Sequence, residues 1–218
     1  MTPRGVVFDM DGVLFDTEVV FDEAWRQVAR RMGIADIEPA IRDCRGVTPM
    51  FIREYFGREY PAVDYDEFDR LAGELYEELI KNGVLEKPGM QQILKDLRAK
   101  GIKIALATSG VRERVLHHLQ QAGIEHAFDA IITGDMVKHS KPAPDIYLTA
   151  AEALGIPPAD CIAVEDSHNG VRSAHAAGMH VAMVVDQMPA TDEMRALTWR
   201  VFDNLDQLNA AISNISNY

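Results

Sequence analysis

The sequence predicts an α/β fold in which a doubly wound parallel sheet carries a small, all-helical insertion. Short and almost continuously apolar segments alternate with longer amphipathic segments over most of the chain. This alternation is typical of a parallel sheet that is covered by helices on both faces. It breaks off after the first apolar segment and resumes near Pro88, and the stretch between has only helical periodicity. The insertion therefore follows directly after the first strand.

Five segments have the pattern of buried strands. Each is short, apolar and bounded by polar or turn residues, as expected for strands that are covered on both faces. They are residues 5–10 (GVVFDM), 102–109 (IKIALATS), 129–133 (DAIIT), 161–165 (CIAVE) and 180–185 (HVAMVV). Ligands of such sheets bind beyond the carboxyl ends of the strands, so we expect polar residues that follow these segments to meet in one crevice.

Three segments between the predicted strands have helical periodicity, namely residues 90–100, 111–123 and 145–155. Gly101 and Gly123 stand at the positions where the first two of these helices should stop. Glycine is favoured there because it adopts the left-handed backbone conformation that ends many helices. Strands and helices therefore alternate, as the doubly wound fold requires.

The helical insertion spans residues 17–87, and residues 1–16 with 88–218 form the core domain. Helical patterns inside the insertion cover residues 18–33, 49–57 and 64–83. Asp16 and Thr17 are suitable residues for a helix start, and the stretch NGVLEKPG before the core resumes is suitable for a loop. We expect hinges at both junctions.

Composition and charge predict a globular protein that does not bind nucleic acids or anionic membranes, and the same charge also disfavours anionic small molecules. The chain has 218 residues, of which 47% are hydrophobic, and its formal net charge is −12. Such a charge repels nucleic acids and anionic membrane surfaces. No apolar run approaches the roughly 20 residues of a membrane span, and Asp9 and Asp11 interrupt the apolar start of the chain before a signal peptide could form. We expect a cytoplasmic protein, and nothing in the sequence demands more than a monomer.

The predicted strand ends deliver acids, hydroxyls and a lysine to one edge of the sheet. The first strand ends in Asp9 and Asp11, and the strand over 102–109 ends in Thr108 and Ser109. A lysine, Lys141, follows the strand over 129–133. The strand over 161–165 ends in the acids Glu165 and Asp166.

This set of residues fits metal-assisted phosphoryl transfer. A carboxylate can attack phosphorus and form an aspartyl phosphate, which splits one difficult displacement into two easier ones. Mg²⁺ prefers oxygen ligands and would offset the crowding of Asp9, Glu165 and Asp166. Lys141 and Thr108 would bind phosphate oxygens. Gly12 would let the chain turn so that Asp11 faces the leaving group and transfers protons there.

Four motifs in this order resemble those of the haloacid dehalogenase-like hydrolases. They are DMDGVLFDT (9–17), ALATSG (105–110), SKPAPD (140–145) and VEDS (164–167), and they span nearly the whole core. Within that family the sequence is most similar to the branch of β-phosphoglucomutase-like phosphatases. The resemblance implies a Rossmann-like core and identifies the insertion with the small helical cap of the family.

The resemblance also implies the roles of individual residues. It makes Asp9 the nucleophile and Asp11 the general acid and base. It implies Mg²⁺ held by the Asp9 side chain, the Asp11 carbonyl and Asp166, with Glu165 beside it. In the insertion, the loop residues Gly46, Val47 and Thr48 are candidates for lining the substrate pocket when a cap closes. The alternative is that this loop only connects helices.

The predicted function is a Mg²⁺-dependent phosphatase for a small phosphorylated metabolite such as a sugar phosphate. Asp11 argues against the dehalogenases of the family, which lack this second aspartate. A phosphohexomutase of the β-phosphoglucomutase type is the first alternative. Such mutases have arginine at the position of Pro49 and histidine at that of Phe21, so this chain departs from their pattern. A catalytically silent binding protein on the same fold is the lesser alternative.

Three of the candidate residues also have purely structural interpretations. Thr108 and Ser109 are residues that cap helices, and a helical pattern follows them at 111–123. Lys141 also fits the interpretation of an ordinary surface residue, because lysine is mostly exposed in folded proteins. These interpretations make different structural predictions, because a phosphate-binding lysine must approach the acids.

Overall fold

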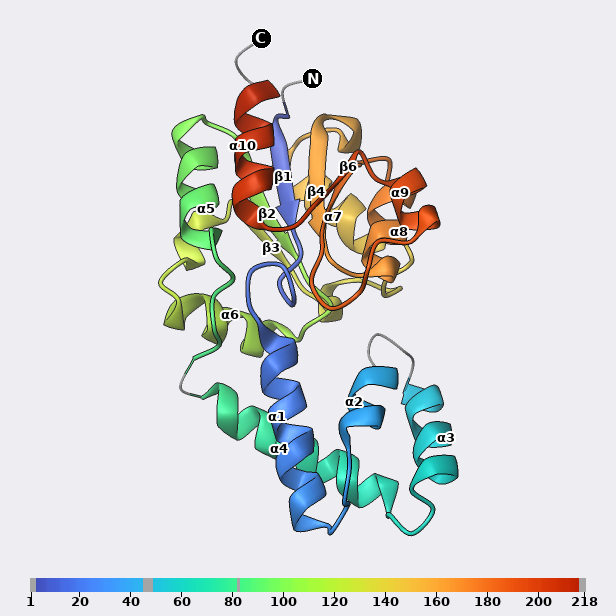
Figure 1. Ribbon diagram of the computed structural model, residues 1–218. Coiled ribbons are helices and arrows are strands. Elements are labelled where there is room, and N and C mark those ends of the chain that lie inside the picture. The colour runs from blue at the N-terminus through green and yellow to red at the C-terminus, as the bar shows by residue number, and fades with distance from the viewer. Residues whose placement is uncertain (1–2, 45–48, 82, 216–218) are drawn as a thin grey trace. The chain divides into compact units, whose positions relative to one another are not determined.

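The computed structural model describes residues 3–44, 49–81 and 83–215 (Figure 1). The strands are β1 (Gly5–Phe8), β2 (Lys103–Ala107), β3 (Ala130–Ile132), β4 (Cys161–Glu165), β5 (His180–Val184) and β6 (Arg200–Phe202). The helices are α1 (Thr17–Arg31), α2 (Glu38–Asp43), α3 (Pro49–Glu59), α4 (Tyr65–Ile80), α5 (Met90–Ala99), α6 (Arg112–Gln121), α7 (Asp145–Leu154), α8 (His168–Ala176), α9 (Asp192–Leu197) and α10 (Leu205–Ile215). Among the described residues, no helix has the length and apolar character needed to cross a membrane.

The strands form one parallel sheet in the order β3-β2-β1-β4-β5-β6. This confirms the predicted α/β fold with a doubly wound parallel sheet. The five predicted strands are present, but the edge strand β6 was not predicted. It has only three residues, and its first residue, Arg200, is exposed, so it lacks the continuous apolar run that marked the other strands.

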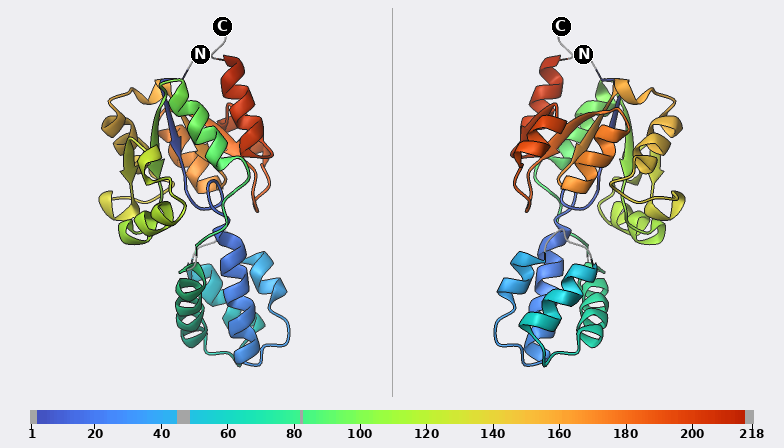
Figure 2. Two further views of the ribbon diagram at one scale, coloured as in Figure 1. Left: turned by 90° about the vertical axis from the view of Figure 1, so that its left-hand side faces the viewer. Right: turned by 90° about the vertical axis from the view of Figure 1, so that its right-hand side faces the viewer.

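Helices cover both faces of the sheet, which explains why its central strands are apolar throughout. All four residues of β1 and all five of β4 are buried. Helices α5 and α10 pack on one face, and α7 and α8 pack on the other. The two views of Figure 2 show the sheet between these layers.

The chain reverses its direction of travel across the sheet at β1. From β1 it moves outward through β2 and β3, then returns to the other side of β1 with β4 and continues to β5 and β6. Because connections on the two sides diverge at such a switch point, a crevice opens beyond the carboxyl ends of the strands. Asp9 follows the strand at this point.

The chain divides into two compact units, one of Met1–Phe15 with Leu85–Tyr218 and one of Asp16–Val84. The second unit contains α1, α2, α3 and α4 and no strand among its described residues. Its core surrounds Trp25, whose ring lies 5.4 Å from the ring of Phe56 and 5.3 Å from that of Phe68. Helix α2 was not predicted, because six residues are too few to display helical periodicity.

The first unit also buries a histidine without polar partners. His118 in α6 is 1% exposed, and in the described part of the chain neither ring nitrogen has a hydrogen-bond partner. Its ring makes an edge-to-face contact with Phe15, with the centroids 6.1 Å apart. Burial, together with the nearby His117 and Arg114, lowers the pKa of His118 to about 4. The fold therefore holds this side chain in its neutral form.

We expect His118 to make the protein less stable in mild acid. The pKa of this group in the folded state lies below its ordinary value of 6.5, so the unfolded chain binds the proton more tightly. Stability should be unaffected above pH 6.5 and should fall by about 1.4 kcal/mol for each pH unit between 6.5 and 4. Urea unfolding at several pH values, for the wild type and His118→Leu, measures this loss.

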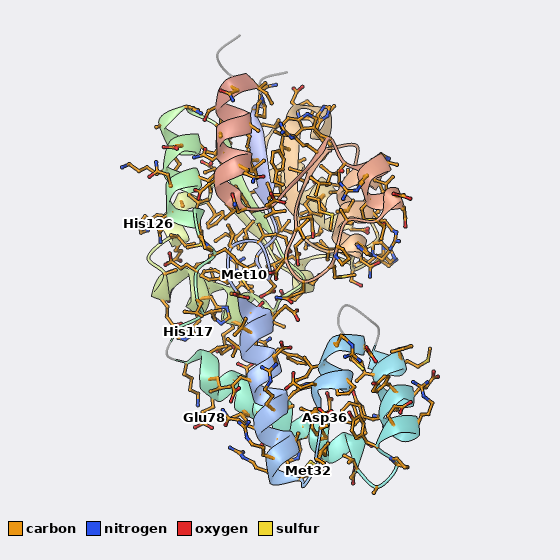
Figure 3. All side chains as sticks on the ribbon, viewed as in Figure 1. Met10, Met32, Asp36, Glu78, His117 and His126 are labelled. Carbon is orange, nitrogen blue, oxygen red and sulfur yellow. The ribbon has the colours of Figure 1, made fainter. Side chains whose placement is uncertain are left out.

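The difference between these two proteins isolates His118 from the carboxyl groups that titrate in the same range. His126→Gln is a suitable control, because an exposed ring is solvated in the folded and the unfolded state (Figure 3). A wild type and a His118→Leu variant with parallel pH profiles would contradict the assignment.

Candidate active site

The register of the sheet places Asp9 between two neighbouring strand ends. Phe8 pairs with Leu106 of β2 on one side and with Val164 of β4 on the other. The Asp9 N–H then donates to the Val164 carbonyl at 2.9 Å. The side chain of Asp9, which is 7% exposed, therefore emerges beside the last residues of β2 and β4.

Lys141 binds the ends of three adjacent strands with one ammonium group. Its Nζ lies 2.6 Å from Asp9 Oδ1 and 2.5 Å from Glu165 Oε1, and it donates to the Ala107 carbonyl at 3.1 Å. Its side chain is only 8% exposed. A lysine in this environment is not a surface residue, and it neutralises part of the acidic charge that the strands deliver.

Both carboxylate oxygens of Glu165 accept hydrogen bonds from the protein. Oε1 accepts from Lys141 and, at 2.6 Å, from the hydroxyl of Tyr147. Oε2 accepts from the Ser167 hydroxyl at 3.0 Å and from the N–H of Asp166 at 3.2 Å. A methyl group on Gly170 would overlap the Glu165 carboxylate, so the glycine provides the space for it. This fully buried acid thus orients its neighbours on several elements.

The third acid of the cluster, Asp166, lies close enough to share a cation with Asp9 and Glu165. One oxygen from each of the three carboxylates lies within 4.8 Å of the others. Oxygen donors at such mutual distances suit a hard divalent cation such as Mg²⁺. Since Glu165 already accepts several hydrogen bonds, Asp9 and Asp166 are the side chains better placed to give oxygens to an ion.

The loop after β1 turns sharply at Gly12. Met10, between the two aspartates, is buried and anchors the loop in the core (Figure 3). Gly12 has φ +76°, a conformation that residues with a Cβ atom disfavour. Its N–H donates to the Phe15 carbonyl at 2.9 Å. A methyl group here would also overlap the Asp166 carboxylate. Asp11 precedes this turn, and its backbone forms an isolated β-bridge with Phe15.

The site contains more negative than positive charge. Burial raises the pKa of Asp9 to about 7, helped by Glu165 and Asp11, although Lys141 acts against this shift. Burial and the neighbouring acids also raise the pKa of Asp166 well above its ordinary value. A divalent cation between them would remove this repulsion and keep both groups ionised. The donor atoms and the charge of the site therefore fit Mg²⁺.

The predicted phosphate-binding hydroxyls follow β2, next to the carbonyl that Lys141 contacts. Thr108 is fully buried, and its Oγ1 accepts from the N–H of Gly110 at 3.0 Å. Ser109 is exposed, and its carbonyl lies so close to Gly134 that a side chain there would clash with it. The N-cap residue of α6, which begins at Arg112, is Val111, and no side-chain oxygen accepts a capping hydrogen bond there.

The described residues do not include every candidate. Gly46, Val47 and Thr48 of the insertion loop lie outside them. Phe21 is described and is 39% exposed, with its ring 5.3 Å from that of Trp25.

Two residues that contact the acids were not predicted. Tyr147 has the spacing of an apolar helix face, which concealed its hydroxyl contact to Glu165. Ser167 was noted only as part of a motif, but its side chain also accepts from the N–H of Gly170 at 3.1 Å and so caps α8. The available sequence signal for Tyr147 was its position six residues after Lys141, in a helix that packs on the sheet.

Known proteins resemble this chain along most of its length. The family model for haloacid dehalogenase-like hydrolases matches residues 6–184. The chain is 36% identical over 180 residues to the phosphorylated carbohydrates phosphatase of Thermotoga maritima, which covers 81% of this chain and 82% of that protein. It is 31% identical over 194 residues to the β-phosphoglucomutase of Bacillus subtilis, covering 85% of each.

A solved structure agrees with these matches. The HAD family hydrolase of Deinococcus radiodurans, crystallised with bound phosphate and sodium, superposes with a TM-score of 0.84 at 26% identity, over 98% of this chain and 96% of that one. The resemblance seen in the four motifs is thereby confirmed. With its parallel sheet, its acidic strand ends and these relatives, the chain belongs to the haloacid dehalogenase-like hydrolases, a family in which its relatives include phosphatases and a β-phosphoglucomutase.

Proposed function

We propose that this protein is a Mg²⁺-dependent phosphatase that hydrolyses a small phosphorylated metabolite, such as a sugar phosphate, through an aspartyl phosphate on Asp9. The observation that carries the proposal is the cluster of Asp9, Glu165 and Asp166, in which Lys141 pairs with the first two acids. A relative that is named a phosphorylated carbohydrates phosphatase supports the substrate class. The proposed enzyme is a cytoplasmic monomer.

In the first step Asp9 acts as the nucleophile. Its free carboxylate oxygen bonds to phosphorus while the bond between phosphorus and the ester oxygen of the substrate breaks. Asp11 gives its proton to the departing oxygen, which leaves as an alcohol. Lys141 donates to the other oxygen of Asp9, Oδ1, at 2.6 Å and so orients the carboxylate for this step.

In the second step water attacks the phosphorus of the aspartyl phosphate. Asp11, now deprotonated, takes a proton from this water. The bond between the Asp9 oxygen and phosphorus breaks, inorganic phosphate leaves, and both aspartates return to their starting states. The same residue thus serves as acid and then as base, as the two opposite proton transfers require.

The remaining site residues bind charge in this proposal. Asp9, Asp166 and the backbone carbonyl of Asp11 hold Mg²⁺, with Glu165 beside them. The ion supplies positive charge to the phosphoryl oxygens and to the crowded acids. Lys141, Thr108 and Ser109 bind phosphate oxygens, and the loop residues 46–48 contact the rest of the substrate.

A mutase is the second candidate function, because a β-phosphoglucomutase is among the relatives. In a mutase the aspartyl phosphate passes its phosphoryl group to a second sugar hydroxyl in place of water. Pro49 and Phe21 occupy the positions where mutases of this type have arginine and histidine. A chain without these two groups has fewer means of holding a second phosphate, which favours water as the acceptor.

A single incubation separates the phosphatase from the mutase. With Mg²⁺ and β-glucose 1-phosphate or a panel of other sugar phosphates, we expect free phosphate to accumulate in step with the loss of substrate. Phosphate release is measured by a colorimetric assay, and sugar isomers are separated by chromatography. Rapid formation of glucose 6-phosphate with little free phosphate would instead establish the mutase.

Replacing the nucleophile should abolish turnover. We expect Asp9→Asn to lower kcat by more than about 10³-fold, because an amide cannot form the acyl phosphate. Acid quenching during turnover, followed by mass spectrometry, should find a phosphoryl group on Asp9 in the wild type and none in the variant. Asp160→Asn is a matched control, because Asp160 pairs with Arg4 at the opposite edge of the sheet. A phosphoryl group trapped on another residue would refute the mechanism.

Replacing Asp11 should slow both proton transfers but spare the metal site. We expect Asp11→Asn to lower kcat by about 10²–10⁴-fold for sugar phosphates. With p-nitrophenyl phosphate, whose leaving group needs no proton, the variant should release one equivalent of nitrophenol quickly and then stall at the aspartyl phosphate. Stopped-flow absorbance measures this burst, and calorimetry measures Mg²⁺ binding, which should be retained because the Asp11 carbonyl remains. Equal losses for both substrates without a burst would contradict the role of Asp11.

A further inference from the structure

A second ion pair lies at the same edge of the sheet and has no part in the proposed chemistry. Asp186 lies two residues beyond the end of β5, and its Oδ1 lies 2.7 Å from the Nζ of Lys87. The side chains are 9% and 16% exposed. Within the described chain, Asp186 Oδ2 is buried without a hydrogen-bond partner. Such a poorly satisfied buried acid is costly, so it calls for an explanation.

The register of β4 and β5 brings Asp186 to the proposed metal site. Glu165 pairs with Met183, so Asp166 and Asp186 both emerge just beyond these two neighbouring strands. A pocket of about 230 Å³ is lined by Asp186, Lys87 and Gly12, among others. Gly12 in turn packs directly against the Asp166 carboxylate. The ion pair and the candidate metal ligand are therefore neighbours around one glycine.

Lys87 is held in place by its backbone. Its N–H donates to the Leu14 carbonyl at 2.8 Å, and the preceding residue, Glu86, bridges to Phe15. The segment that follows the insertion is thus paired with the segment that precedes it. Because the backbone is fixed, the charge of Lys87 has a defined position relative to the strand ends.

The two carboxylates at this edge act on each other electrostatically. Asp186 and Asp166 emerge beyond neighbouring strands and both lie near Gly12, so the negative charge of Asp186 adds to the potential at Asp166. The negative charge of Asp186 disfavours a second negative charge nearby and therefore favours a cation beside Asp166. Lys87 acts in the opposite sense, since its positive charge cancels part of the field of Asp186.

We propose that Asp186 and Lys87 set the affinity of the metal site without touching the ion, with Asp186 strengthening the attraction for Mg²⁺ and Lys87 limiting it. The inference rests on the proposed function, because it takes Asp166 as a metal ligand. Groups beyond the direct ligands commonly tune metal affinity in this way.

The test is the dissociation constant of Mg²⁺, measured by isothermal titration calorimetry without substrate at about pH 8, where carboxyl groups are ionised. Lys87→Met should tighten binding by about 5-fold, because the field of Asp186 is then unopposed. Asp186→Asn should weaken binding by about 5-fold, because the field is removed and Lys87 remains. A purely structural ion pair predicts shifts in one direction, since both variants break the same contact.

Matched controls separate local charge from net charge. Arg4→Met and Asp160→Asn make the same charge changes in an ion pair at the opposite edge of the sheet, where Arg4 and Asp160 lie 3.2 Å apart. Both should leave the dissociation constant within about twofold of the wild type, because distance and salt screen their charges. The double variant Lys87→Met/Asp186→Asn removes both opposing charges and should also bind Mg²⁺ within about twofold of the wild type.

Opposite shifts of the two single variants support the inference. Shifts in the same direction, or shifts no larger than those of the controls, overturn it. If a single variant fails to fold, the double variant decides, because a dissociation constant more than about threefold from the wild type is incompatible with cancelling charges. A wild type that binds no Mg²⁺ would refute the proposed function itself, which is a different result.

Discussion

The acidic strand ends of this protein depend on one buried ammonium group. Lys141 contacts the carboxylates of Asp9 and Glu165 and the carbonyl at the end of β2, so it joins three neighbouring strands at their carboxyl ends. A buried charge is tolerated only when it is paired and hydrogen-bonded. Removing it would leave two buried carboxylates facing each other. The strand ends can carry this much acid only because the lysine is there.

One lysine is not enough to balance the charge. Asp9, Glu165 and Asp166 converge on one region, and Asp186 adds to their field. The pKa values of Asp9 and Asp166 are raised as a result, which opposes the ionised form that a nucleophile requires. The protein alone therefore disfavours the charged form of Asp9, the proposed nucleophile. This shortage of positive charge connects the structure to the proposed dependence on a divalent cation.

Much of the fold and the site follows from simple patterns in the sequence. Continuous apolar strands between amphipathic helices predicted the parallel sheet, and the rule that strand ends meet at one edge predicted that Asp9, Lys141 and Glu165 would lie together. Other contacts depend on information that a local pattern lacks. The pairing of Lys87 with Asp186 joins residues 99 positions apart and follows from the register of β5. Likewise β6 and α2 are too short to show a period.

The position of β1 also bears on how the site comes into existence. This strand precedes residues 16–84 in the chain, but its partners in the sheet are residues 103–106 and 161–164. Residues 16–84, by contrast, form a compact unit whose contacts are largely internal. On the ribosome we expect the helical unit to fold early. The acidic segment that follows β1 stays without its strand partners until most of the chain has emerged. The strand ends that carry the acids are consequently assembled after the helical unit.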